Sequence, residues 1–339
     1  NLLKKIIDFS FDVQGFPKSR NLRQLIFYLK YFILIREWLK ESQNEIPEYL
    51  NEIIFYLGQN YNFIWQNTNQ NLLFNGNQIN QNNDFDRYLS FHNYKFKNES
   101  NEYGGYVILK NKNVILSADL GSSPEKKFSN DYQSGALSFE IFFNNCKLIS
   151  NCGYFQNYKH QLNSISKSTA THSTMILDNR SSCKLKKDSD GIFKVDQELK
   201  ILKKFVTFEK KYWNISGSHD GYLKKYGVIH ERKIEFFIEK NKFIGTDKLI
   251  KNKKFKSSNF EIRFHFEPGV KITKTQDEKS ILVELENSGW KFSCKDHKID
   301  VETGLYFGKK NSFVENQNIF ISGLTQNEDQ EIVWEIIKI

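Results

Sequence analysis

The sequence predicts an N-terminal helical segment followed by a large antiparallel β region, built as a sandwich or as stacked sheets. Apolar residues recur at helical spacing within the first 66 residues. From about Phe91 onward, short alternating runs separated by turn residues take over. No helical stretch of useful length separates these runs, and strands without crossover helices pair antiparallel. The aromatic content, dominated by 30 Phe and 16 Tyr, also suits sheets.

Two helices are expected before the β region. The apolar face of the first comprises Leu22, Leu25, Ile26, Leu29, Phe32 and Ile33. The second follows Pro47, a residue that suits the first turn of a helix, and ends near Gly58. Two antiparallel helices are a poor domain by themselves. We therefore expect them to be the tail of a larger helical array that begins upstream.

A polar connector, GNQINQNNDFD over residues 76–86, predicts a domain boundary, giving a helical domain at 1–85 and a β domain at 86–339. Strands are predicted at Tyr106–Leu109, Asn113–Ala118, Ala136–Phe143, Lys147–Asn151, Met175–Leu177, Phe205–Lys210, Tyr212–Ser218, Val228–Glu239, Phe260–Phe266, Ser280–Glu286, Trp290–Cys294 and Glu331–Ile336. A loop is predicted between the second and third of these, at Asp119–Tyr132.

Composition limits the classes of partner. A net charge of +9 favours polyanions such as nucleic acid, anionic membrane or acidic polysaccharide, although a compositional bias toward Lys explains the charge equally well. No aromatic-plus-basic motif of a nucleic-acid module is present, so nucleic acid is not expected. No apolar run is long enough for an integral membrane segment. The four cysteines form no Cys-x-x-Cys pair, which favours free thiols over one disulfide in the central stretch.

Residues 131–183 are expected to be the centre of a carbohydrate-handling site. His172 follows a Ser/Thr-rich turn and precedes a buried strand, so it is either a base or charge neutraliser in a cleft or a buried, hydrogen-bonded turn histidine. Tyr154 and Tyr158 lie on a Gly-Tyr loop, where either can act as an acid or stack on a sugar ring, or simply pack. His160 shares this loop. The His219-Asp220-Gly221-Tyr222 run is interpreted as a hairpin turn and His230 as a core histidine.

Several motifs occur in order along the chain: ALSFEI at 136–141, NCGYF at 151–155, KSTATHSTMILD at 167–178, SHDGY at 218–222, GVIHERKI at 227–234 and FHFEPGV at 264–270. Together they resemble the heparinase II/III-like family of polysaccharide lyases, and most of all its bacterial heparinase II/III family protein subgroup. The resemblance implies an incomplete α/α toroid followed by an antiparallel β-sandwich, with substrate in the cleft between them. It also implies β-elimination at a uronic acid.

The chain departs from the family pattern at several positions. Gln133 stands where the first β motif has His, Asn151 where the second has Asp, and Lys167 where an Arg precedes the third motif's His172. In some members two His and one Asp at these motifs hold zinc, and the equivalents here are Gln133, Asn151 and His172. Amides are poor zinc ligands, so no zinc and no other cofactor is expected. Gln133, Asn151, Lys167 and His160 are expected to contact substrate instead.

The function expected from the resemblance is cleavage of an acidic, uronate-containing polysaccharide, with His172, Tyr154 and Tyr158 as catalytic candidates. Whether the chain is still an enzyme is left open, because the motif residues are altered. The alternative is a non-catalytic glycan-binding or envelope-polysaccharide assembly protein on the same scaffold. The family suggests a periplasmic or envelope location, with the cytoplasm as the alternative, since no export signal is visible.

Overall fold

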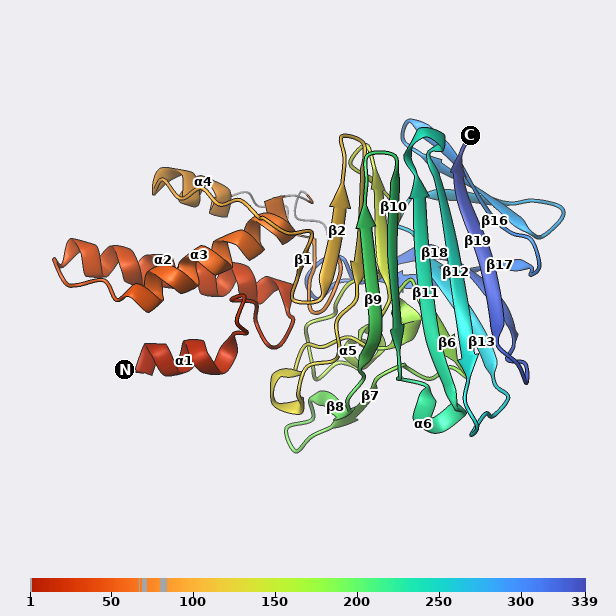
Figure 1. The fold of residues 1–339 in the computed structure, drawn as a ribbon, viewed down its shortest axis with the longest axis horizontal. Helices are drawn as coiled ribbons and strands as arrows, with labels where there is room; N and C mark the ends of the chain where they lie inside the picture. Colours follow the sequence, from red (N-terminus) through yellow and green to blue (C-terminus); the bar gives the residue numbers. More distant parts are fainter. Residues whose placement is uncertain (1, 67, 69–71, 80–83) are drawn as a thin grey trace.

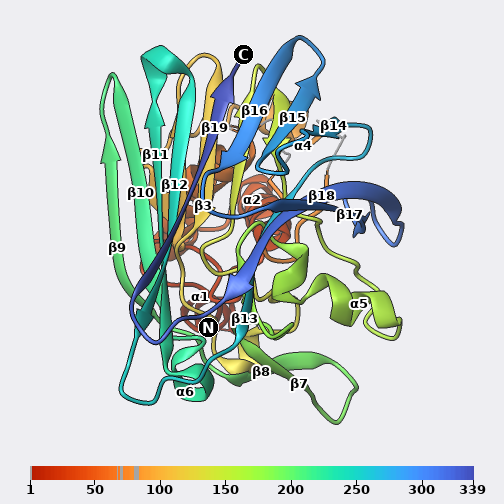
Figure 2. The same cartoon turned by 90° about the vertical axis from the view of Figure 1, so that its right-hand side faces the viewer.

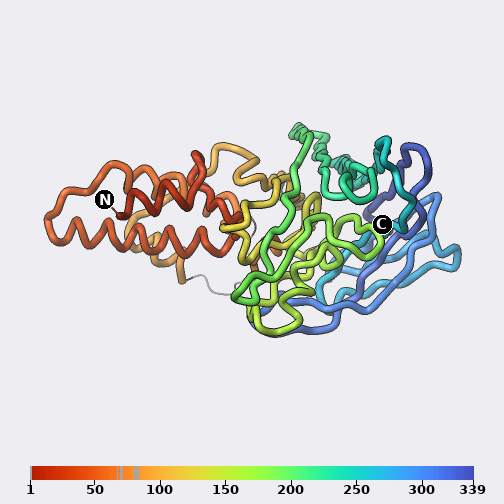
Figure 3. Tube along the Cα trace, turned by 90° about the horizontal axis from the view of Figure 1, so that it is seen from below, coloured from red at the N-terminus to blue at the C-terminus, as the bar shows by residue number. Residues whose placement is uncertain are grey.

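The computed structural model describes residues 2–66, 68, 72–79 and 84–339. The helical part comprises α1 (Leu2–Ser10), α2 (Leu22–Glu41), α3 (Glu48–Tyr61), the π-helical turn η1 (Asn62–Gln66) and α4 (Asp84–Phe91). The side chain of Asn21 caps α2 by accepting a hydrogen bond from Arg23 N, and Pro47 is the N-cap residue of α3. The two predicted helices are confirmed. They extend away from the β region, which forms the other end of an elongated molecule (Figures 1 and 3).

The strands of the described residues form four sheets. A five-stranded sheet has the order β1 (Glu102–Tyr103), β2 (Tyr106–Lys110), β3 (Val114–Asp119), β4 (Phe139–Phe143), β5 (Cys146–Ile149). An eight-stranded sheet has the order β14 (Lys271–Lys274), β15 (Ser280–Leu285), β16 (Ser288–Cys294), β19 (Gln330–Lys338), β12 (Lys242–Lys251), β11 (Val228–Phe237), β10 (Tyr212–His219), β9 (Ile201–Phe208). A four-stranded sheet has the order β17 (Ile299–Tyr306), β18 (Val314–Leu324), β13 (Asn259–His265), β6 (Met175–Leu177). The hairpin β7 (Lys184–Lys187) and β8 (Phe193–Gln197) stands apart.

The predicted fold class, helices followed by an antiparallel sandwich, is confirmed. The ladders between these strands are antiparallel. Short helices connect several of them: η2 (Lys126–Phe128), α5 (Gln161–Ser166), η3 (Thr169–Thr171), α6 (Leu223–Tyr226) and η4 (Ile238–Lys240). Both α5 and α6 are shorter than two helical turns, so they are too short to be recognised from the spacing of apolar residues. The turn at Asp220 is therefore longer than predicted, because α6 lies between β10 and β11.

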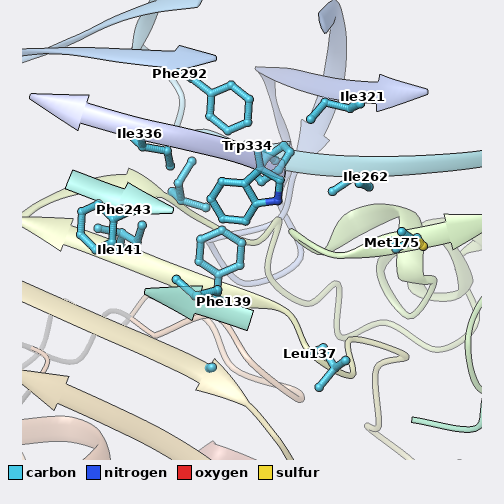
Figure 4. Close-up of a cluster of buried hydrophobic side chains, with 14 of the residues drawn as sticks. Leu137, Phe139, Ile141, Met175, Phe243, Ile262, Phe292, Ile321, Trp334 and Ile336 are labelled. Carbon is cyan, nitrogen blue, oxygen red and sulfur yellow. The ribbon is translucent and has the colours of Figure 1, made fainter. Parts of the chain in front are cut away.

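The main core lies between the facing sheets of the β region. Strands β11 and β12 alternate strictly between buried and partly exposed residues, as expected of strands with one face on a core. Phe139 of β4 and Phe292 of β16 lie on either side of Trp334 of β19, with ring centroids 5.5 and 5.9 Å away (Figure 4). The rings are nearly parallel to that of Trp334, at 13° and 15°. Three sheet segments far apart in sequence are thus joined by one aromatic stack.

The five-stranded sheet is buried on both faces. Val107 and Leu109 of β2 join the main core, whereas Tyr106 and Ile108 of the same strand join a second core with the helices. This explains why β2 and β3 have almost no exposed residue. Leu89 of α4 also belongs to the helical core. The packing of the helical part therefore continues past residue 85, and the boundary between 85 and 86 stays a prediction.

A buried ion pair joins the helical part to this sheet. Arg20 lies just before α2 with a left-handed backbone (φ 59°), and its Nη2 lies 2.6 Å from Oδ1 of Asp119 at the end of β3. Asn75 Nδ2 donates to the other carboxylate oxygen at 3.0 Å. A Cβ added at Gly121 would lie 2.1 Å from the Arg20 guanidinium carbon, so only glycine leaves room for this pair.

A buried polar network crosses the main core. The Asp247 carboxylate of β12 accepts hydrogen bonds from His230 Nε2 (2.7 Å), Arg232 Nε (2.8 Å) and Trp334 Nε1 (2.8 Å). Burial alone raises the pKa of Asp247, but Arg232 and His230 outweigh it and lower that pKa below its ordinary value. The Arg232 guanidinium also donates to the backbone carbonyls of Leu137 (3.1 Å) and Ser173 (2.7 Å). The interpretation of His230 as a core histidine is confirmed.

Two smaller expectations are met within the described residues. The four cysteines are free, and three of them are buried. No helix that the structure describes is long and apolar enough to cross a bilayer.

Candidate functional site

Gln133 fastens three loops together. Its Oε1 accepts a hydrogen bond from Gly76 N at 2.9 Å. Its Nε2 donates to Gly153 O at 3.0 Å and to Ser166 O at 2.6 Å. The side chain is completely buried, and both ends of the amide are occupied. Gln133, predicted to contact substrate, therefore holds the connector, the Gly-Tyr loop and the end of α5 in place, and does not reach the surface.

Asn151 has a similar structural position. Its Oδ1 accepts from Ser173 N at 2.8 Å, next to His172, and its backbone N donates to Glu140 Oε1 at 2.9 Å. Glu140 is itself paired with Lys147, 3.3 Å away, and both side chains are buried. Asn151 is fully buried as well. Asn151 thus links the turn at His172 to β4, and a contact with substrate stays a prediction.

His172 is buried, with 1% of its surface exposed. Its Nδ1 lies 2.9 Å from Ser168 O, so Nδ1 carries the proton and Nε2 is the bare nitrogen. Nε2 has no hydrogen-bond partner within the described chain. Burial lowers the pKa of His172 to about 4. Of the two alternatives for His172, the buried, hydrogen-bonded turn histidine agrees with this geometry. A base for a polymer substrate has to reach the polymer, so a catalytic role of His172 stays a prediction.

Gly135 explains why the imidazole fits. A Cβ at this position would lie 2.5 Å from Cδ2 of His172. The ring thus rests against the backbone of Gly135. A larger residue here would displace the ring or be displaced by it.

The residues present do not fit a zinc ion. His172 offers a bare Nε2, but the oxygens of Gln133 and Asn151 already accept backbone hydrogen bonds. Gly135 offers no ligand atom. In the part of the chain that the structure describes, no three His, Cys, Asp or Glu side chains are grouped to hold a metal. That this site binds no zinc stays a prediction, to be tested by metal analysis.

Tyr154 belongs to a polar group at the junction of the helical and β parts, which we call the junction cluster: Asn21, Arg23, Asp131, Tyr154 and Asn163. Tyr154 Oη donates to Asp131 Oδ1 at 2.9 Å and accepts from Asn163 Nδ2 at 3.1 Å. Asn21 Nδ2 donates to Asp131 Oδ2 at 2.7 Å. Burial and the Asp131 carboxylate raise the pKa of Tyr154. Tyr154 is 1% exposed, so its phenol is committed to this cluster.

Arg23 and Asp131 bring the junction cluster to the surface. Their side chains are 30% and 34% exposed, with Nη2 of Arg23 4.0 Å from Oδ2 of Asp131. The guanidinium carbon lies 5.6 Å from the centre of the Tyr154 ring. Arg23 Nε makes no hydrogen bond among the described residues. The cluster thus presents a partly exposed cation beside an anchored tyrosine.

Tyr158 and His160 lie on the exposed part of the Gly-Tyr loop. The Tyr158 side chain is 46% exposed, so of the three catalytic candidates it is the one that a polymer can contact. His160 is the N-cap residue of α5, where its Nδ1 accepts a hydrogen bond from Leu162 N at 3.2 Å. His160 has this local structural task, and nothing in the geometry adds a substrate contact.

A cavity of about 650 Å³ is lined by residues of both the helical part and the β region. We call it the interdomain cavity. The loop before α2 contributes Phe16, Lys18 and Arg20, and the start of β9 contributes Lys203 and Lys204. That a substrate groove lies between helices and sheets stays a prediction. None of the seven site residues predicted from sequence lines it.

Lys167 lines a different cavity, next to α5, β7, β8 and α6. Its Nζ donates to the backbone carbonyls of Phe193, at 2.9 Å, and of Asn130. Burial lowers the pKa of Lys167 to about 8. Lys167 therefore joins neither the junction cluster nor the interdomain cavity, although it fixes the residue before Asp131.

Comparison with protein families identifies the chain. Residues 97–335 match the family model described as heparinase II/III-like, C-terminal. The chain belongs to the heparinase II/III-like family. A search of curated proteins gave no match.

Solved structures of this family share the fold. A heparan sulfate lyase from Pedobacter heparinus matches with a TM-score of 0.78 at 14% identity, over 99% of this chain and 55% of that one. A heparinase III gene product matches with a TM-score of 0.80 at 14% identity, over 100% and 55%. Another heparinase III structure matches with a TM-score of 0.78 at 14% identity, over 100% of this chain and 56% of that one. The chain thus spans about half the length of these proteins, and at this identity the likeness concerns the fold.

Apart from Tyr154, no residue of the junction cluster is predicted from sequence. Asn21 and Asp131 are 110 positions apart, so sequence spacing does not link them.

Proposed function

We propose that this chain forms the β-sandwich side of a polysaccharide-lyase site, which takes an acidic, uronate-containing polysaccharide between the helical part and the β region. The observation that carries the proposal is the interdomain cavity, bordered by basic side chains of both parts. Family membership supports the same reading. A net charge of +9 also favours an acidic polymer.

The chemistry calls for a cation beside the uronate carboxylate. The C5 proton of a uronate is weakly acidic, and neutralising the adjacent carboxylate stabilises the charge that develops when the proton leaves. Arg23 is proposed for this contact, because its side chain is 30% exposed at the junction of the helical and β parts, although Arg23 is not among the residues that line the interdomain cavity. Tyr158 is proposed as the acid at the leaving oxygen or as a stacking surface. The base is not assigned to His172, whose side chain is buried.

Product absorbance tests this proposal. β-Elimination leaves an unsaturated uronate that absorbs in the ultraviolet, so the chain is incubated with a panel of uronate-containing polysaccharides. We expect absorbance to rise with at least one of them and to fall at least about tenfold in Arg23→Gln, the loss of one charge-assisted contact. Arg36→Gln, on the same helix but paired with Glu37, is the matched control. Equal rates in both variants would remove Arg23 from the site.

Glycan binding without cleavage is the second candidate. It is favoured by the burial of His172 and by the occupied amide of Gln133, since neither side chain is free to react. Under this alternative, the chain acts in envelope-polysaccharide assembly or recognition, in the periplasm or cell envelope. Binding of a polysaccharide by the wild-type chain with no ultraviolet product, from any polymer of the panel, would decide for it.

A further inference from the structure

A second cavity lies at one end of the β region, where α5, β7, β8 and α6 come together (Figures 1 and 2). We call it the basic cavity. Its volume of about 520 Å³ is in the range of small-molecule sites. Its charged lining consists of Lys167, Arg180, Lys184, Lys224 and Lys225, against the single carboxylate of Glu198. It shares no lining residue with the interdomain cavity.

Most of this positive charge is not neutralised by the protein. Lys184 pairs with Asp196 at 2.6 Å, but within the described residues Arg180, Lys224 and Lys225 make no ion pair. Desolvation and then the neighbouring guanidinium of Arg180 lower the pKa of Lys225, and the nearby carboxylate of Asp178 opposes this shift without reversing it. Like charges gathered on a concave surface repel one another and concentrate the positive potential within it. An anion placed there would relieve the repulsion.

The floor of the basic cavity adds a buried cation. Lys167 is 0% exposed, and its ammonium group hydrogen-bonds to backbone carbonyls, of which Phe193 O lies at 2.9 Å. Among the described residues no carboxylate makes an ion pair with it, although the carboxylates of Asp131 and Asp188 favour its charge from farther away. A buried charge whose direct partners are neutral is only partly compensated. A negative charge above the floor would therefore stabilise Lys167 as well.

Neutral groups complete a site for an organic anion. Ser181 Oγ accepts from Thr169 N at 3.0 Å, and its own proton has no acceptor in the described structure. Phe193 supplies a partly exposed apolar wall beside the cations. Donors, cations and an apolar wall around one cavity suit a tetrahedral oxyanion attached to a small carbon skeleton.

We infer that the basic cavity binds a ligand of about disaccharide size that carries a sulfate or phosphate ester, at a site separate from the interdomain cavity. Sulfated sugars and sugar phosphates share this chemistry. The inference concerns other residues than the proposed lyase function and does not depend on it.

Calorimetry on the whole chain tests the inference with three probes: a sulfated disaccharide, glucose 6-phosphate and an uncharged disaccharide. We expect one or both esters to bind and the uncharged sugar not to. The double variant Arg180→Gln/Lys225→Gln is expected to weaken ester binding at least about tenfold, the effect of losing charge-assisted hydrogen bonds. Which ester binds more tightly identifies the source of the oxyanion.

The matched control removes the same charge elsewhere. Lys240→Gln/Lys295→Gln replaces two exposed lysines that line neither cavity, and we expect ester affinity to change less than about twofold. Failure of both esters to bind, or equal weakening in the two double variants, would overturn the inference. Polysaccharide cleavage by Arg180→Gln/Lys225→Gln is measured in parallel, so that a failure of the basic cavity is distinguished from a failure of the lyase proposal.

Discussion

Acidification is expected to destabilise this protein through its buried histidines. Burial lowers the pKa of His172 from 6.5 to about 4 and that of His265 from 6.5 to about 3. Each ring therefore binds a proton more readily in the unfolded chain. The stability that these rings confer is complete above pH 6.5 and is lost as the pH falls from 6.5 toward the folded-state pKa values.

The size of the effect follows from these values. At pH 5 each unfolded-state histidine is almost fully protonated and each folded-state one almost neutral, which costs about 2 kcal/mol per residue, or about 4 kcal/mol for the pair. His219 and His230 are also buried with lowered pKa values, so they act in the same direction. Burial raises the pKa of Glu140, which opposes the trend, so a histidine variant is needed to isolate it.

Urea unfolding at pH 8 and pH 5 measures the effect, with the buried Trp213, Trp290 and Trp334 as fluorescent reporters of the β region. With a slope of about 3 kcal/mol per molar urea, 4 kcal/mol lowers the midpoint by about 1.3 M. His172→Gln is expected to reduce the difference between the two pH values by about 2 kcal/mol, or about 0.7 M in the midpoint. Identical midpoints at pH 8 and pH 5 for the wild-type chain would refute the reasoning.

Three further predictions concern packing, the buried ion pair and metal. Gly135→Ala is expected to lower the free energy of unfolding by about 1–3 kcal/mol, because its Cβ would overlap the His172 ring. Gly289→Ala is the control, since its Cβ would meet only a flexible Ile side chain. Thermal unfolding of the two variants checks this, and equal melting temperatures would contradict it. Arg20→Ala leaves a buried carboxylate unpaired and is expected to cost about 3–5 kcal/mol, against less than about 1 kcal/mol for the exposed Arg87→Ala; limited proteolysis between helices and sheets should detect the loosening. Added zinc or a chelator is expected to leave the melting temperature unchanged. A zinc-dependent rise in melting temperature, or zinc found in the purified protein, would contradict the prediction that Gln133, Asn151 and His172 bind no zinc.

Residues with a regular period made most of the fold predictable. Strand β11 alternates over its whole length, so its bounds and the core position of His230 could be read from sequence. Strands β17 and β18 carry polar residues such as Glu302 and Asn316 among the apolar ones, which hid them. Helix α5 has six residues, fewer than two turns, and its polar composition gives no stripe to detect.

The site was harder to predict, because its geometry depends on contacts that sequence spacing does not encode. His172 is buried because it rests on Gly135, 37 positions earlier, and a motif match does not say which way a ring points. The catalytic role predicted for Tyr154 stays a prediction, and only the fold brings its partner Asp131 and the nearby Arg23 to it. The sequence shows which side chains have suitable chemistry, but it does not show which of them solvent or a substrate can reach.

The Arg232 contacts described above bear on the order in which the molecule assembles. This guanidinium donates hydrogen bonds to the carbonyls of Leu137 and Ser173, which precede Arg232 by 95 and 59 positions. Both carbonyls leave the ribosome well before the strand that holds them. Contacts of such long sequence separation form slowly. The segments that carry Leu137 and Ser173 therefore gain this contact only after β11 has been made, and a nascent or truncated chain that ends before β11 lacks it.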